Sequence, residues 1–296
     1  MIPTIIGKSV RGDSHVRHSI ECQDSLLIID GKHRCNRRKS AASPYYNDLP
    51  EGVKIVAVAD GHGSSSSPHS KTGSQTAVNV FCDLMAEYAV KFRENMDELF
   101  ASLNREGETI RISRRIVSEW EQRVLKVHSI NGREMPVNEQ NSKDINAVWK
   151  QYGTTLLGML IVDENAFFLQ LGDGDITFVN ETDASAVLES EKILGVETHS
   201  ISKPDSWKKV ITKAVHLGDN TVPFMYLLST DGWLNSHATQ EDFYRTCREY
   251  YEAILNYGPE AVENNLENWL AETSKLGCGD DITVACVCFE GEQSLE

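Results

Sequence analysis

The feature that most constrains this 296-residue chain is an apolar run that stops abruptly at an acid. Val53–Val58 consists of β-branched and small apolar residues, interrupted only by Lys54, and this composition predicts a strand buried on both faces. The residues that follow are Ala59, Asp60, Gly61, His62 and Gly63. The strand directs Asp60 out of its end, and the two glycines allow the backbone to turn and approach an ion or a phosphate. An ordinary Asp-Gly turn is the alternative, since Asp30-Gly31 also follows an apolar run.

The same combination of an apolar strand and an acid recurs far along the chain. Acids come directly after two apolar segments, Phe167–Leu171 and Phe224–Ser229. Acids also come directly before two others, Ser25–Ile29 and Ile282–Phe289. With Asp60, the acids concerned are Asp24, Asp173, Asp231 and Asp280, whereas Asp281 is expected to be a turn or supporting residue. If the strands are neighbours, these carboxylates gather at one end, where they repel one another unless a cation neutralises them. Oxygen ligands suit hard ions such as Mg²⁺ or Mn²⁺, so the pattern predicts a metal site.

These segments stand in the order seen in the metal-dependent protein phosphatase family, type 2C. The resemblance extends from about Gly7 to Phe289, and its opening, Gly12-x-x-His15 with Cys22-Gln23-Asp24, resembles the bacterial-type branch. The other matching segments are Asp60-Gly61-His62-Gly63, Gly153-Thr154-Thr155-Leu156, Gly172-Asp173-Gly174, Ser229-Thr230-Asp231-Gly232 and Asp280-Asp281-Ile282-Thr283-Val284. Each motif alone is weak, but their order over nearly the whole chain is specific.

The resemblance implies an α+β fold, a four-layer αββα sandwich of two antiparallel β-sheets flanked by helices. We expect residues 1–296 to form a single domain of this kind, since 40% hydrophobic residues can fill a real core. The short apolar segments over Thr154–Asn180 are typical of a meander of antiparallel strands. Apolar residues at helical spacing predict helices over Thr76–Ala86, Asp97–Leu103, Thr109–Val127, Gln240–Tyr257 and Pro259–Lys275.

The resemblance also implies a metal-dependent serine/threonine phosphoprotein phosphatase that hydrolyses phosphoserine and phosphothreonine esters with a metal-activated water. Two divalent cations, Mg²⁺ or Mn²⁺, are the expected cofactors. Asp60, Asp231 and Asp280 are then expected to ligate one ion. Asp60, the Gly61 carbonyl and the Gln23-Asp24 segment serve the other, and Asp173 matches the acid linked to a third, weaker ion.

Two histidines are candidates for chemistry. His62 is the expected general acid, which protonates the departing serine oxygen because imidazole titrates near the working pH. Asp60 is the second residue that the resemblance implies to be catalytic, because it would bridge the two ions that hold the attacking water. A solvent-exposed turn histidine is the alternative for His62. His15 is a candidate phosphate contact, and a hydrogen bond that caps a strand is the alternative.

The chain departs from the family pattern at three positions. Ser19 stands where the family has the arginine that grips the substrate phosphate, and Arg17, Arg11 and Lys71 are candidate substitutes. Gln23 replaces a glutamate. Asn235 replaces a further acid, which predicts weaker binding of the third ion. Two alternatives to the enzyme therefore remain. One is a catalytically weak or inactive module that binds phosphoproteins or regulates a partner, and the other is a scaffold protein. The intact aspartates at the metal positions favour the enzyme.

Charge and cysteine content limit the partners and the compartment. A net charge of −15 and a pI near 5.1 argue against affinity for nucleic acid or anionic membranes. No apolar stretch is long enough to cross a bilayer. A phosphorylated protein is the expected substrate, and a cognate protein kinase is a further candidate partner. Seven scattered cysteines and the absence of an export signal predict a cytoplasmic protein.

Overall fold

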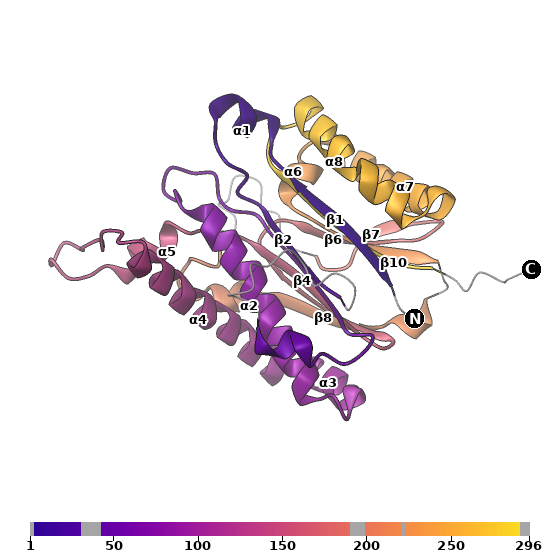
Figure 1. Cartoon of the computed structure of the whole chain (residues 1–296), viewed down its shortest axis with the longest axis horizontal. Coiled ribbons are helices and arrows are strands. Elements are labelled where there is room, and N and C mark those ends of the chain that lie inside the picture. The colour runs from indigo at the N-terminus through magenta and orange to yellow at the C-terminus, as the bar shows by residue number, and fades with distance from the viewer. Residues whose placement is uncertain (1–2, 31–42, 190–198, 221–222, 291–296) are drawn as a thin grey trace, which may run out of the picture.

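Two five-stranded antiparallel sheets form the centre of the molecule (Figure 1), in a computed structural model that describes residues 3–30, 43–189, 199–220 and 223–290. The first sheet has the order β2 (Ser25–Ile29), β3 (Lys54–Ala59), β4 (Leu156–Val162), β5 (Asn165–Leu171) and β8 (Ile211–His216). The second has the order β1 (Thr4–Val10), β10 (Ile282–Phe289), β9 (Phe224–Ser229), β6 (Asp175–Val179) and β7 (Ala184–Ala186).

Helices cover the outer face of each sheet (Figure 1). The helices on the side of the first sheet are α2 (Ser70–Lys91), α3 (Met96–Leu103), α4 (Glu106–Ile130) and α5 (Ile145–Lys150). Those on the side of the second sheet are α7 (Gln240–Tyr257) and α8 (Pro259–Leu276). Short helical segments complete the described chain: α1 (Asp13–His18), α6 (Asp231–Leu234), η1 (Pro44–Asn47), η2 (Ser206–Lys209) and η3 (Leu217–Asp219). The predicted four-layer αββα arrangement is confirmed.

Strand β3 shows why the layers form. Its side chains alternate between the two faces of the sheet. Ile55 and Ala57 belong to the core shared with α2 and α4, whereas Val56 and Val58 belong to the core between the two sheets. All six residues of β3 are buried, so the prediction of a strand covered on both faces is confirmed.

The predicted meander over Thr154–Asn180 is wrong in its last part. Strands β4 and β5 do pair in the first sheet, but β6 pairs with β7 and β9 in the second. The chain crosses between the sheets at Gly172, whose φ of +113° disfavours any residue with a side chain. The sequence also gave no clear signal for β8, whose side chains are half-buried or exposed at the edge of the sheet.

Strand ends from both sheets meet at one end of the sandwich. Ser25 pairs with Ala59 in the first sheet. In the second, Asp175 and Val284 both pair with Ser229. The acids that the sequence places beside these strands are therefore brought together from distant parts of the chain.

Across the described residues, no helix combines the length and the apolar character needed to span a membrane.

Candidate active site

A cleft of about 940 Å³ opens at this end of the sandwich. Most of the predicted site residues line it, including His62 and Gly61 of the turn after β3. The histidine and charged side chains along its walls are His15, Asp60, His62, Asp144, Lys150, Lys203, Asp231 and Asp280. The cleft therefore combines a strongly acidic region with two lysines.

Three aspartates converge beside this cleft. Asp60 follows β3, Asp173 lies in the crossover from β5 to β6, and Asp231 begins α6 after β9. One carboxylate oxygen from each lies within 4.8 Å of the other two. Such a cluster of oxygen donors fits a hard divalent cation. The sequence assigned Asp173 only to a weaker third ion. In the structure it lies together with Asp60 and Asp231, two of the acids expected to ligate the first ion.

The electrostatics of this cluster favour a cation. Burial, and then the nearby carboxylates of Asp24 and Asp231, hold the pKa of Asp60 well above its usual range. Burial, followed by Asp173 and Asp280, raises the pKa of Asp231 to about 6. Carboxylates that are close together and poorly solvated resist ionisation unless a positive charge compensates them. The donor set therefore fits divalent metal ions.

The Gly-Thr-Thr segment before β4 fixes the backbone at Asp60 and His62. Asp60 donates its N–H to the Thr155 hydroxyl at 3.0 Å, and its carbonyl accepts from the Thr155 N–H at 2.8 Å and the Thr154 hydroxyl at 2.6 Å. His62 donates its N–H to the Gly153 carbonyl at 3.1 Å. A Cβ at Gly153 would lie 2.6 Å from the His62 ring, so the glycine lets the ring lie against the backbone. These residues therefore support the site through the backbone of Asp60 and His62.

Asp24 is held by the chain itself. Its Oδ2 accepts hydrogen bonds from the Thr230 and Thr283 hydroxyls, both at 2.8 Å. Burial, followed by the charge of Asp281, raises its pKa well above the usual range. Asp24 does not belong to the three-aspartate cluster, and one of its oxygens is occupied by these two hydroxyls. Its part in metal binding stays a prediction.

Gln23 presents a buried oxygen beside the turn after β3. Its Oε1 has no hydrogen-bond partner among the described residues and lies 3.4 Å from where a Cβ at Gly63 would stand. The Gln23 carbonyl oxygen lies only 2.6 Å from the position of a Cβ at Gly61, so no larger residue fits there. A buried oxygen without a donor is an observation that also fits a cation in this place.

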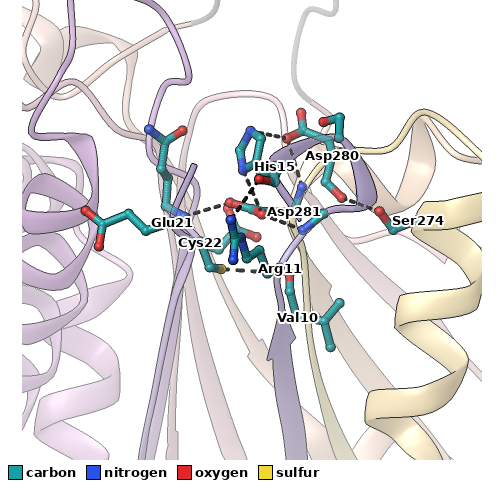
Figure 2. A network of polar contacts seen from close by, with 12 residues as sticks. Val10, Arg11, His15, Glu21, Cys22, Ser274, Asp280 and Asp281 are labelled. Carbon is teal, nitrogen blue, oxygen red and sulfur yellow. Dashed lines mark hydrogen bonds and ion pairs between the residues drawn. The ribbon is translucent and has the colours of Figure 1, made fainter. Parts of the chain in front are cut away.

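Asp281 holds the N-terminal segment against the site (Figure 2). Its two carboxylate oxygens accept the backbone N–H groups of Gly12 and Gln23, each at 2.6 Å. The His15 Nδ1 lies 2.9 Å from Oδ1 of Asp281, and the His15 Nε2 lies 3.8 Å from Oδ1 of Asp280. His15 thus contacts Asp280, which lines the cleft, and the buried Asp281.

The structural role of Asp281 was only partly visible in the sequence, which marked it as a turn or supporting residue. Asp280 and Asp281 precede β10, and successive residues near a strand point to opposite sides. Asp280 accordingly has an exposed side chain (54%) on the cleft, whereas the side chain of Asp281 is buried (3%). This alternation indicates that the two side chains point to different sides, but not which of them turns inward.

The arginine predicted to contact phosphate lies elsewhere. Arg17 pairs through Nε with Asp13 Oδ2 at 2.9 Å, its side chain is mostly exposed, and it does not line the cleft. Ser19, at the position of the family's arginine, is exposed and has a left-handed backbone with φ 57°. The sequence did not single out Lys150, which does line the cleft.

Asn235 contacts the cluster directly. Its Nδ2 donates a hydrogen bond to Asp231 Oδ2 at 2.9 Å. Where the family has a further acid, this chain therefore has a neutral side chain bonded to one of the clustered carboxylates. The bond supplies Asp231 with a donor but no additional negative charge.

Comparisons with known proteins agree with this geometry. The family model described as protein phosphatase 2C matches residues 11–271. A search of curated proteins finds no match. Among solved structures, the Mycobacterium tuberculosis serine/threonine phosphatase PstP is 13% identical with a TM-score of 0.54, covering 98% of this chain and 100% of that one.

Two further structures have similar scores. The S. agalactiae serine/threonine phosphatase is 15% identical with a TM-score of 0.56, covering 97% of this chain and 100% of that one. The catalytic domain of PstP in complex with two manganese ions is 13% identical, also with a TM-score of 0.56, covering 98% and 99%. At these identities the structural likeness shows a shared fold.

Proposed function

The chain belongs to the protein phosphatase 2C family and is a metal-dependent serine/threonine protein phosphatase, and we propose that Asp60, Asp173 and Asp231 are the centre of its metal site. The observation that carries this proposal is the convergence of their ligand oxygens within 4.8 Å of one another. Nothing in the described residues favours the inactive module or the scaffold over the enzyme.

We propose that two divalent ions, Mg²⁺ or Mn²⁺, occupy the site. Asp60 and Asp231, with Asp280 on the cleft wall, are the ligands proposed for one ion. Asp60, the Gly61 carbonyl and the Gln23-Asp24 segment are proposed for the other. The Gln23 Oε1, for which the described residues offer no hydrogen-bond donor, supports this second set, because a buried amide oxygen can replace a carboxylate as a ligand for a hard ion. Asp173 adds to the charge that attracts the ions.

The ions, when bound, would lower the pKa of a coordinated water and offset the charge of the phosphoryl group. The chain supplies the remaining groups. His62, held through its backbone by Gly153, lines the cleft beside Asp60 and is the proposed general acid for the departing serine or threonine oxygen. His15 contacts Asp280 and Asp281, and this placement supports a role in holding the acids more than in binding phosphate.

Phosphorylated proteins are the substrates of this class of enzyme. We further propose a cytoplasmic location and a cognate kinase that phosphorylates the same proteins. The acidic net charge of −15 supports the absence of nucleic acid and anionic membranes among the partners.

The direct test is phosphate release from a phosphothreonine peptide and from p-nitrophenyl phosphate. We expect activity with Mn²⁺, its loss with excess chelator, and its recovery when Mn²⁺ is returned. Asp231→Asn should be nearly inactive, because it removes a carboxylate from the cluster. Asp183→Asn is a matched control, since Asp183 is exposed in the turn before β7 and lies away from the cleft.

The outcomes separate the possible functions. Activity that persists in chelator would contradict the metal mechanism. No activity under any condition, together with binding of the phosphopeptide, would instead identify a phosphoprotein-binding module.

A further inference from the structure

The two lysines of the cleft lie beside residues that surround Gly153. The Ser67 hydroxyl and the Ser202 hydroxyl lie 3.0 and 3.3 Å from where a Cβ at Gly153 would stand. Lys203 follows Ser202 directly, and both line the cleft. The region around Gly153, next to the His62 ring, is therefore rich in hydroxyl groups and carries the positive charge found among the described cleft residues.

Lys150 is fixed to this region through its backbone. It is the last residue of α5, and its carbonyl accepts hydrogen bonds from the Ser67 hydroxyl at 2.9 Å and the Gly153 N–H at 3.3 Å. Gly153 in turn accepts the His62 N–H. The Lys150 ammonium group forms no ion pair with any described residue. A flexible cation is thus anchored close to the proposed general acid and is available to a ligand.

The position of His62 indicates which part of a substrate meets Lys150. His62 is proposed to protonate the serine or threonine oxygen as the phosphoryl group leaves. The peptide that carries this oxygen must therefore lie on the His62 side of the site, and the phosphate must lie toward the carboxylates and their ions. A side chain next to the phosphorylated residue would then come within reach of Lys150 and Lys203.

Charge decides which side chain fits best. The chain carries a net charge of −15, so an acidic substrate segment is repelled by most of the molecule. A lysine in the cleft offsets this repulsion locally. Asp144 also lines this part of the cleft, but its Oδ1 accepts the Ala147 N–H at 3.0 Å, which caps the start of α5.

We propose that Lys150 gives the enzyme a preference for phosphorylated segments with an acidic residue beside the phosphoserine or phosphothreonine. This proposal rests on the proposed function of the same cleft. The scissile phosphate is a second anion that a lysine could bind, and the experiment distinguishes it from an acidic side chain.

The test compares two phosphothreonine peptides that differ only by aspartate or asparagine next to the phosphorylated residue. With the Mn²⁺-loaded full chain, we expect a higher kcat/KM for the acidic peptide. Lys150→Gln should lower the ratio of the two kcat/KM values by about two- to fivefold, the size expected for an exposed ion pair. Lys150→Glu should reverse the preference, and Lys150→Arg should keep it.

Lys126→Gln is the matched control, because Lys126 is exposed on α4, does not line the cleft and carries the same charge. It should leave the ratio unchanged. If Lys150→Gln lowers activity on both peptides and on p-nitrophenyl phosphate by one common factor, the lysine binds the scissile phosphate and the proposal is wrong. An unchanged ratio in Lys150→Gln and Lys150→Glu would also overturn it. A wild-type chain inactive on all substrates would contradict the proposed function instead.

Discussion

Asp281 and Asp60 stand at the same end of the sandwich, but the chain surrounds their carboxylates differently. Asp281 receives two backbone N–H groups, from Gly12 and Gln23, each at 2.6 Å. Asp60 is held through its backbone, while its carboxylate shares its surroundings with those of Asp173 and Asp231. One charge is compensated by hydrogen bonds within the chain, and the other is placed among like charges.

This difference separates residues that build the site from residues that serve it. Backbone donors stabilise an ionised carboxylate and so contribute to folding. Carboxylates that crowd one another destabilise the metal-free protein, because each ionised group raises the cost of ionising the next. A cation that binds only the folded state reverses this cost and adds to stability. The same residue type thus has opposite energetic roles a short distance apart.

The largest expected effect comes from Asp60→Asn. Removing this carboxylate should lower kcat/KM at least roughly a thousandfold, because metal catalysis supplies several kcal/mol of transition-state stabilisation. The free energy of unfolding of the metal-free protein should not fall, since the substitution also removes a repulsive charge. Steady-state kinetics with Mn²⁺ and urea unfolding with excess chelator measure the two quantities. A large loss of metal-free stability would show that Asp60 is a structural residue.

The same chemical change at Asp281 should act on folding. Asp281→Asn exchanges one accepting oxygen for an NH₂ group that faces a backbone N–H, and leaves that donor buried without an acceptor. We expect the free energy of unfolding to fall by about 2–4 kcal/mol. Urea unfolding in excess chelator measures it, so that metal binding does not contribute. An unchanged urea midpoint would contradict the role of Asp281 in holding the N-terminal segment.

The sequence revealed the parts of this contrast between Asp60 and Asp281 that depend on neighbouring residues, but not the parts that depend on contacts between distant residues. Each apolar run that ends at an acid is a local pattern, and it correctly indicated that Asp60 and Asp231 leave strand ends at one end of the sandwich. The roles of Asp280 and Asp281 depend on which one turns inward. That choice is made by the distant N–H groups of Gly12 and Gln23, which are close only in the folded chain.

Other features depended on tertiary structure still more strongly. The crossover at Gly172 sends β6 into the second sheet and brings Asp173 beside Asp60, although the local pattern resembles a simple meander. Lys150 belongs to no motif and reaches the cleft because its carbonyl is bonded to Ser67 and Gly153. Arg17 was a candidate substitute for the family's phosphate-binding arginine, but the nearby Asp13 pairs with it.

A pH titration of stability sharpens the comparison in the absence of metal. The pKa of Asp231 is raised from 3.8 to about 6, so the folded protein holds a proton that the unfolded chain releases. Stability should therefore be greater at pH 5.5 than at pH 7.5, and the shift of Asp231 alone gives a loss of about 0.8 kcal/mol on raising the pH. Urea unfolding at the two pH values in chelator measures this change. Mn²⁺ should stabilise the protein more at pH 7.5, because protons compete with the ion at pH 5.5.

Asn235→Asp has the smallest expected effect. It tests whether Asp231, a member of the acidic cluster, depends on a hydrogen bond from the chain as Asp281 does. The Asn235 Nδ2 donates to Asp231 Oδ2 at 2.9 Å, so this member of the cluster already has one donor from the chain. An aspartate would remove the donor and add negative charge at an exposed position. We expect Mn²⁺ to bind about two- to fivefold more tightly at pH 7.5 in a calorimetric titration, the effect of one exposed charge. Asn235→Ala removes the donor without adding charge and is the control. If both variants weaken Mn²⁺ binding, the amide acts by orienting Asp231, and the cluster depends on a chain-supplied hydrogen bond much as Asp281 does.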